Sequence, residues 1–308
     1  MRILKNLRLV CCAVMLCMAT YMWAEKQPEA YRLYDNKGKA ITYDQLVSAL
    51  SKVDVVFVGE IHNCVITHWL ELKLLESLYK ANEKHLKMGL EMFESDNQLI
   101  LNEYLSGQIS GERFEDEARL WPNYSTDYAP LISFAREHHM PVVATNVPRR
   151  YATAVKEHGL AYLDSLSTEA KSYMAPLPIQ FKTNENVEQG FALMGIMGKN
   201  KNANPRQIAE AQAIKDATMA WRIAQNLPGK FIHFNGNFHT DSRDGIISYL
   251  LQYKPKATYA VVRAVRQEDI SHLEDDYKGI ADYYICVPED DNVILSKPIC
   301  CLRHRNMF

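Results

Sequence analysis

The sequence lacks the motifs that mark several common classes of enzyme. It contains no H-E-x-x-H zinc motif, no G-x-S-x-G nucleophile elbow, no phosphate-binding G-x-x-x-x-G-K-[ST] loop and no dinucleotide-binding G-x-G-x-x-G. Hydride transfer, phosphoryl transfer and ordinary serine hydrolysis therefore lack support. A C-x-x-C pair is also missing, and the adjacent Cys300 and Cys301 do not have the spacing of a zinc site.

Strong charge of either sign is also absent. The 308 residues carry a formal net charge of −2, and no run of Lys or Arg forms a basic patch. We therefore expect no nucleic-acid partner and no membrane-surface patch. Hydrophobic residues make up 47% of the chain and aromatic residues 10%, which is enough for a substantial core and excludes a disordered protein.

The N-terminus predicts export. Arg2, Lys5 and Arg8 precede the apolar stretch 9–18, which is the pattern of a signal peptide that we place at residues 1–24. Lipid attachment at Cys17 is the alternative, and the apolar run is short for a retained membrane span.

Two states stay open for the cysteines of the mature chain. In an oxidising compartment Cys286 could pair with Cys300 or Cys301 and hold the C-terminal segment. The other state is a set of free, buried thiols.

Strand-like apolar runs alternate with helix-length periodic segments along the chain. This alternation predicts an α/β fold with a mostly parallel sheet flanked by helices. We expect one domain over residues 25–308, with a helical insertion at about 150–228 that forms either a lid or a subdomain without a gating role. Expected strands are 53–59, 88–93, 141–145, 231–236 and 258–265, with 283–287 as an edge strand; expected helices are 65–82, 96–105, 130–138, 205–226 and 245–253.

Two expected strands end in the same pattern, a glycine followed three residues later by a histidine. The two turns are Gly59-Glu60-Ile61-His62 and Gly236-Asn237-Phe238-His239. A glycine at this point lets the backbone turn sharply, and open α/β sheets bind ligands beside the carboxyl ends of their strands. We therefore expect both histidines in one polar pocket.

Other strand ends add charged side chains to this pocket. A charged group at the end of a buried strand is costly unless it is paired or functional. The structural alternatives are a Glu–Arg ion pair and a capping histidine. The candidates for a catalytic role are Glu60, His62, Glu91, Arg149 and His239.

A second group of candidates is partly aromatic. Trp121, Tyr124 and Tyr128 could line an apolar pocket wall or could simply pack a loop onto the sheet. Phenolate is a known axial haem ligand, which makes the two tyrosines candidate iron ligands. Three further candidates could face the pocket or have a purely structural place: His68, Gln212 and Asp216.

With these residues in place, the chain from about 53 to 265 resembles the ChaN-type haem-binding uptake proteins. Each motif is weak alone, but the ordered set is specific. It consists of Gly59–His62 with His68, Gly89–Phe93 with Asp96 and Gln98, Trp121–Tyr124 with Tyr128–Leu131, Pro141–Ala144 with Asn146–Arg149, Gln212, Asp216, Met219-Ala220, and Gly236–His239 with Gly245-Ile246.

The resemblance implies an exported bacterial protein, periplasmic or associated with the outer membrane, either lipid-anchored or not. It also implies a homodimer that binds haem at its interface through a tyrosine, here Tyr124 or Tyr128, and an outer-membrane haem receptor or transporter as partner. A wider group with similar strand ends includes erythromycin esterases and Tiki-type metal-dependent proteases. Asn63 replaces a frequent Asp and Phe238 a small residue, and both departures weaken the hydrolase comparison more than the haem comparison.

The sequence supports three hypotheses. The first is haem binding for iron acquisition, in which Glu60, His62, Glu91 and His239 could exchange protons with a porphyrin in a chelatase-like step. The alternative is a metal-dependent hydrolase, with a histidine as base, Glu60 and Glu91 holding a divalent metal ion and Arg149 stabilising negative charge. The third is a non-catalytic interaction protein.

Overall fold

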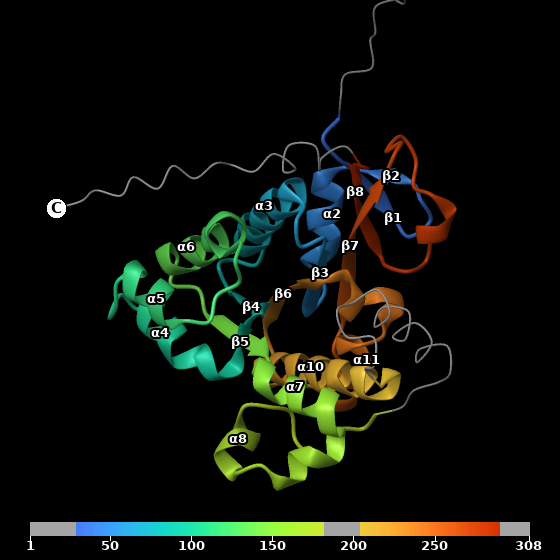
Figure 1. Ribbon diagram of the computed structural model, residues 1–308. Helices are drawn as coiled ribbons and strands as arrows, with labels where there is room; N and C mark the ends of the chain where they lie inside the picture. The colour runs from blue at the N-terminus through green and yellow to red at the C-terminus, as the bar shows by residue number, and fades with distance from the viewer. Residues whose placement is uncertain (1–28, 182–203, 290–308) are drawn as a thin grey trace, which may run out of the picture. The chain divides into compact units, whose positions relative to one another are not determined.

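An eight-stranded sheet forms the centre of the molecule (Figure 1). The computed structural model describes residues 29–181 and 204–289, and its elements belong to one compact unit that begins at Tyr31. The strand order is β2-β1-β8-β7-β3-β6-β4-β5. All neighbours from β8 to β5 are parallel, which confirms the predicted α/β class with a mostly parallel sheet. The strands are β1 (Arg32–Asp35), β2 (Ala40–Ile41), β3 (Val55–Glu60), β4 (Leu86–Glu94), β5 (Val142–Asn146), β6 (Lys230–Gly236), β7 (Tyr259–Gln267) and β8 (Tyr283–Pro288).

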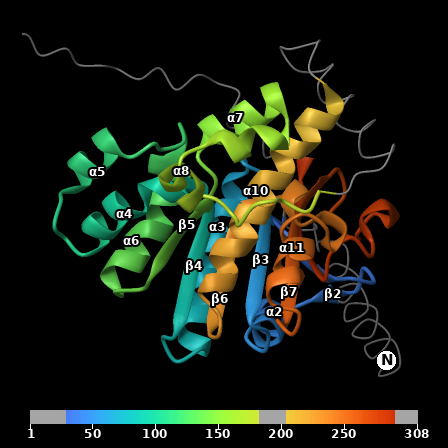
Figure 2. The ribbon, with the colours of Figure 1, turned by 90° about the horizontal axis from the view of Figure 1, so that it is seen from below.

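Helices cover both faces of this sheet. The second view shows β4, β6, β3 and β7 side by side with α10 across them (Figure 2). The α-helices are α2 (Tyr43–Leu50), α3 (Val65–Ala81), α4 (Gln98–Leu105), α5 (Gly111–Glu117), α6 (Ala129–Glu137), α7 (Arg149–His158), α8 (Thr168–Ser172), α10 (Pro205–Gln225) and α11 (Ile246–Tyr253). Short helical turns are η1 (Ser95–Asn97), the π-helical η2 (Tyr124–Tyr128), η3 (Leu160–Ser165), η4 (Asn237–His239), η5 (Asp241–Arg243) and η6 (Asp275–Tyr277).

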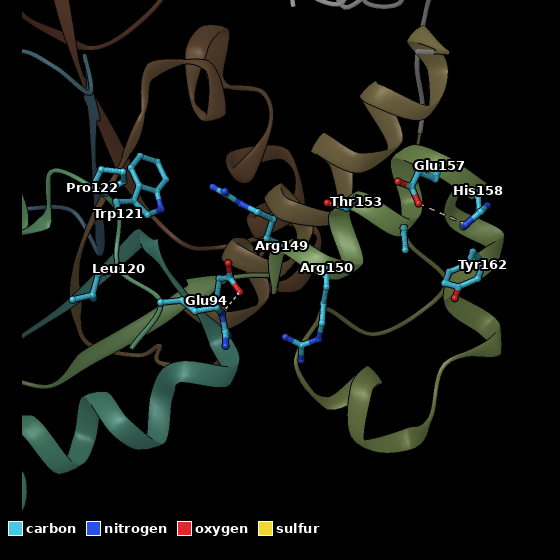
Figure 3. A pocket seen from close by; sticks show the side chains of 12 residues that line it. Glu94, Leu120, Trp121, Pro122, Arg149, Arg150, Thr153, Glu157, His158 and Tyr162 are labelled. Atoms are coloured by element: carbon cyan, nitrogen blue, oxygen red, sulfur yellow. Dashed lines mark hydrogen bonds and ion pairs between the residues drawn. The ribbon is translucent and has the colours of Figure 1, made fainter. Parts of the chain in front are cut away.

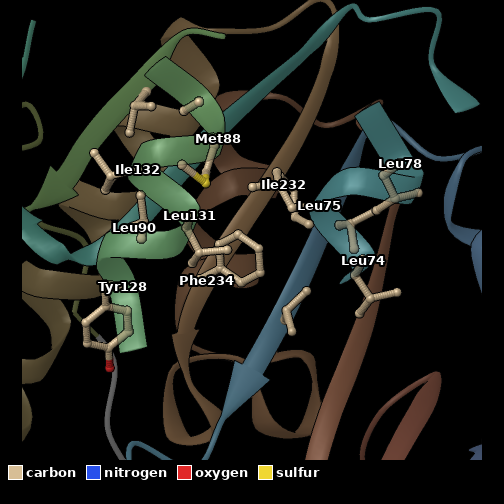
Figure 4. Packing of buried hydrophobic residues seen from close by; sticks show 14 of the residues in the cluster. Leu74, Leu75, Leu78, Met88, Leu90, Tyr128, Leu131, Ile132, Ile232 and Phe234 are labelled. Carbon is tan, nitrogen blue, oxygen red and sulfur yellow. The ribbon is translucent and has the colours of Figure 1, made fainter. Parts of the chain in front are cut away.

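The alternation of side chains along β3 explains why helices are needed on both faces. Val56 and Val58 belong to a core with α2, α3 and α6, whereas Val55 and Phe57 belong to a second core with α10 and α11. Successive strand residues point to opposite faces, so a strand that is apolar throughout must be covered twice. Figure 4 shows the first core, with leucines of α3 and α6 packed on β4 and β6.

The register of the central strands sets the position of the two glycine–histidine turns. β3 lies directly beside β6, and Gly59 pairs with Asn235 while Glu60 pairs with Gly236. β4 flanks β6 on its other side. The carboxyl ends of β3, β6 and β4 therefore meet at one edge of the sheet.

One expected strand has a different place. The sequence predicts residues 283–287 as an edge strand, but β8 is internal, because β1 pairs with it antiparallel and β2 follows as the true edge. The sequence-based prediction missed this hairpin since its strands are only four and two residues long. The other expected strands and helices lie within about two residues of their observed bounds.

The described part of the expected insertion is helical. α7, η3 and the first half of α10 share a small core of Val155, Leu163 and Ile214. Asn204 begins α10 as expected, since its side chain accepts a hydrogen bond from the Arg206 backbone. The assignment of the whole segment as an insertion stays a prediction.

Several expectations lie outside the described residues. These are the signal peptide at 1–24 with Cys17, most of the candidate lid, and Cys300 and Cys301. Cys286 is buried and forms no disulfide within the described residues, and its expected pairing with Cys300 or Cys301 stays a prediction. None of the described helices is long and apolar enough to cross a membrane.

Candidate functional site

Glu91 and His239 form a buried ion pair at the carboxyl edge of the sheet. Glu91 lies in the buried stretch of β4, and its Oε1 lies 3.1 Å from His239 Nε2, while its Oε2 accepts a hydrogen bond of 2.8 Å from the Gly236 backbone N–H. Burial raises the pKa of the Glu91 carboxyl, but His239 and these hydrogen bonds outweigh burial, and the net pKa lies well below its usual range. Glu91 is therefore a fixed carboxylate.

His239 is held on its other nitrogen by α10. Its Nδ1 bonds to Asp216 Oδ1, and the Gln212 side-chain nitrogen lies 2.9 Å away. Burial lowers the pKa of His239, but Glu91 and Asp216 raise it further, to about 10. Burial raises the pKa of Asp216, against the effect of the histidine. The structure thus unites Gln212, Asp216, Glu91 and His239, four of the residues expected in the pocket.

His62 lies beside this pair but is open to solvent. Its Nδ1 lies 2.6 Å from Glu60 Oε1, and its side chain is 47% exposed. The hydrogen bond to Glu60 raises the pKa of His62. The Trp121 ring packs edge-on against it with centroids 5.0 Å apart. Among the described residues, Nε2 of His62 has no hydrogen-bond partner.

Gly236 is required because of the His62 ring. A Cβ at this position would lie 2.8 Å from His62 Cε1 and 2.9 Å from Nε2, closer than side chains approach one another. The backbone there has φ of −60°, which any residue can adopt. The sequence-based explanation, a sharp turn that needs glycine, is therefore wrong for Gly236, and close packing replaces it. Gly59 is similar, since its Cβ would lie 2.6 Å from Asn237 Oδ1.

Glu60 joins His62 to a deeper cluster. Its Oε1 also accepts a hydrogen bond of 2.6 Å from the Tyr128 hydroxyl. Below it, His68 Nδ1 lies 2.9 Å from Glu71 Oε2, and His68 Nε2 lies 3.1 Å from the carbonyl oxygen of His62. Burial lowers the pKa of His68, but Glu71 and Glu60 raise it to about 9. Burial and Glu60 raise the pKa of Glu71.

The two tyrosines expected to bind iron are both buried. Tyr128 is fully buried, and burial together with Glu60 raises the pKa of its hydroxyl well above its usual value. Tyr124 is 6% exposed and packs edge-on against Phe93 and Phe114, away from the histidines. Burial raises its pKa as well. Because a phenolate ligand needs an exposed, ionised oxygen, this arrangement does not favour either tyrosine, and their ligation stays a prediction.

A groove of about 900 Å³ opens beside Trp121 (Figure 3). Leu120, Trp121 and Pro122 form an apolar wall, and three arginines line the rest together with α7 and Tyr162. Arg149 is exposed, points from α7 into the groove, and has no ion pair within the described residues. The structure therefore places Arg149 in this groove and not in the histidine cluster.

The other two groove arginines share a carboxylate. Arg119 bonds to Glu94 at 3.0 Å and to Asp96, and Arg150 also bonds to Asp96. Arg119 and Arg150 were not predicted, because nothing in the local sequence distinguishes them from surface arginines. In the sequence, their common partner Asp96 stands out only as part of the motif set that resembles the family.

Comparison with known proteins identifies the family. A family model described as haem-binding uptake, Tiki superfamily, ChaN matches residues 46–250. The chain belongs to this family. The resemblance inferred from its ordered motifs is thereby confirmed, and the chain is a member of a haem-binding family.

The solved structure described as cofacial heme binding to ChaN of Campylobacter jejuni has a TM-score of 0.64 with 19% identity, and covers 83% of this chain and 96% of that chain. At that identity it shows a shared fold. Protein RETICULATA-RELATED 5, chloroplastic, of Arabidopsis thaliana is 26% identical over 206 residues, which are 61% of this chain and 26% of that protein. The chain thus spans about a quarter of that relative. An erythromycin esterase structure has a TM-score of 0.44 with 11% identity.

Proposed function

We propose that the protein binds haem at the Trp121 edge of the groove, with His62 as the axial ligand. The single observation that carries this is the state of the His62 ring. Its Nδ1 is held by Glu60 at 2.6 Å, its side chain is 47% exposed, and its Nε2 is directed away from Glu60. A histidine whose second nitrogen is fixed by a carboxylate is the usual form of a metal-binding imidazole.

The groove supports the rest of the ligand. Haem combines a flat apolar ring with two carboxylates, and the groove combines Trp121 and Pro122 with the cationic side chain of Arg149. Arginine binds carboxylates through two parallel hydrogen bonds, which favours it for a propionate. His62 does not itself line the groove, but Trp121 contacts His62 and also lines the groove, so Trp121 connects the two parts of the proposed site.

Bound haem would supply the iron, and this chain would hold and orient the histidine that binds it. Glu60 fixes the His62 ring through Nδ1, and Tyr128 fixes Glu60 through its hydroxyl. The ion pair between Glu91 and His239 lies beside the His62 ring and places two charged side chains there. Chelatase-like handling of the porphyrin is a finer part of the proposal, for which the proton-binding groups of this cluster are the support.

The cellular setting is also proposed. The basic and apolar N-terminus supports export, to the periplasm or the outer membrane, with or without a lipid anchor. A homodimer and an outer-membrane haem receptor or transporter are further elements, supported by membership of the family.

A haemin titration followed by absorbance tests the proposal. We expect a Soret band in the wild type, and in His62→Ala a shifted band with affinity lowered about 100-fold, or about 2.7 kcal/mol. Tyr124→Phe is the matched control and should leave the band unchanged. A band lost in Tyr124→Phe or Tyr128→Phe but kept in His62→Ala would restore the tyrosine assignment. The absence of any band in the wild type would refute haem binding.

Haemin dimethyl ester tests the groove separately. Because the ester lacks free carboxylates, Arg149→Gln should weaken haemin binding about tenfold and leave the ester unaffected. Arg136→Gln is the control, since Arg136 stacks on Tyr104 outside the groove. Equal loss for both ligands would show that Arg149 acts on folding and not on a propionate.

A further inference from the structure

Three ligand-type side chains meet beneath the haem-binding edge proposed above. Glu60 comes from β3, and His68 and Glu71 come from consecutive turns of α3. One ligand atom of each lies within 4.8 Å of those of the other two. The residues are 2%, 6% and 0% exposed, so water does not solvate their charges.

Two oxygen atoms in this cluster have no hydrogen-bond partner. Oε2 of Glu60 and Oε1 of Glu71 are both buried and unsatisfied. A buried carboxylate oxygen without a partner costs free energy, and such atoms in a folded protein call for a specific explanation. Glu91 is different, since both of its oxygens accept hydrogen bonds, from His239 and Gly236.

His68 is oriented as metal-binding histidines are. Its Nε2 lies 3.1 Å from the carbonyl oxygen of His62, which can only accept, so Nε2 carries the hydrogen. This leaves Nδ1 facing the two carboxylates, 2.9 Å from Glu71 Oε2 and 3.9 Å from Glu60 Oε2. A metal-binding histidine characteristically donates its other N–H to a backbone carbonyl or a carboxylate.

We propose that Glu60, His68 and Glu71 bind a divalent first-row transition-metal ion such as Zn²⁺ or Mn²⁺. One imidazole nitrogen and two carboxylates are a common ligand set for these ions. A divalent ion would also compensate the carboxylate charge of Glu60 and Glu71 in this buried site. The ion would join β3 to α3 directly behind His62.

This site is distinct from the haem proposal and from the hydrolase hypothesis. It uses neither His62 Nε2 nor the groove arginines, and Glu60 shares the ion with His68 and Glu71 instead of Glu91. Its ligands are buried, which is typical of a structural metal site.

Cobalt titration of the full-length, EDTA-treated protein tests the proposal. We expect one Co²⁺ per chain with a visible d–d absorption band, displaced by Zn²⁺. Glu71→Gln and His68→Gln should each lower the affinity at least about tenfold. Glu76→Gln is the matched control, because Glu76 lies on the same helix in a partly exposed pair with Lys73. It should bind Co²⁺ as the wild type does.

The failures of the two proposals are distinguishable. No cobalt band in the wild type at millimolar Co²⁺ would overturn the metal site, and would mean that Glu60 and Glu71 share a proton instead. A band that persists in both Glu71→Gln and His68→Gln would also overturn it, by placing the ion elsewhere. Circular dichroism of each variant verifies folding, and the wild-type result stands even if a variant does not fold. Haemin titration of the metal-free and the Co²⁺-loaded protein tests the haem proposal independently of the metal site.

Discussion

The two glycine–histidine turns share the same four-residue pattern, but their histidines differ in exposure and in hydrogen bonding. The His62 side chain is 47% exposed and has one nitrogen bonded, whereas the His239 side chain is 7% exposed and lies between Glu91 and Asp216. The difference comes from the side chains around each ring, because Asp216 and Gln212 of α10 and Glu91 of β4 contact His239, whereas Glu60 and Trp121 contact His62 and leave it half exposed. A shared motif therefore fixes the position of a side chain but not its role.

The largest expected effect separates the two histidines by stability. Replacing His239 with Asn leaves two buried carboxylates without their cation, so we expect a loss of about 3–5 kcal/mol in the free energy of unfolding. His62→Asn, at a half-exposed position, should cost less than about 1 kcal/mol. Guanidinium chloride unfolding measures both. Equal losses would show that the two histidines have the same structural role.

An intermediate effect should come from Gly236. The methyl group of Gly236→Ala would occupy the space of the His62 ring and displace it, so haemin affinity should fall about tenfold with most of the stability retained. Gly111→Ala is the control, because its added methyl would meet only Tyr104, at an ordinary 3.7 Å. If Gly236→Ala binds haemin as tightly as the wild type, the position of the ring is not what controls binding.

The smallest effect, counted per pH unit, is a dependence of stability on pH. In the folded state the pKa of His239 is about 10, against an ordinary histidine value of 6.5, because Glu91 and Asp216 outweigh burial. The folded protein thus holds an additional proton above pH 6.5, and its stability should fall as pH rises from 6.5 to about 10, by up to about 1.4 kcal/mol per pH unit. Unfolding at pH 6, 8 and 10 measures this slope. His239→Asn should reduce it, and an unchanged slope would contradict the assignment.

Much of this site could be predicted from the sequence. The apolar runs that end in Gly59 and Gly236 identified neighbouring strands, and the rule for parallel sheets placed Glu60, Glu91, His62 and His239 at one edge. These inferences succeed because they depend on local pattern and on a general rule of topology.

The remaining features depend on contacts that local pattern does not contain. Tyr124 and Tyr128 are four residues apart, and only the distant Phe93 and Phe114 decide that one packs in an aromatic core while the other reaches Glu60. The groove arginines likewise become recognisable only when Asp96 lies between Arg119 and Arg150. Such pairings are long-range and result from tertiary packing.

The strand order has a consequence for the order of events during synthesis. β3 ends at Glu60 and its partner β6 begins at Lys230. Most of the chain is therefore synthesised before β3 can pair with β6. Pairings this distant in sequence form late and slow the folding of the whole domain. A nascent or truncated chain that stops before β6 lacks Gly236 and His239, and so lacks the ion pair between Glu91 and His239. This edge of the sheet is therefore complete only after β6 and the turn that follows it have been synthesised.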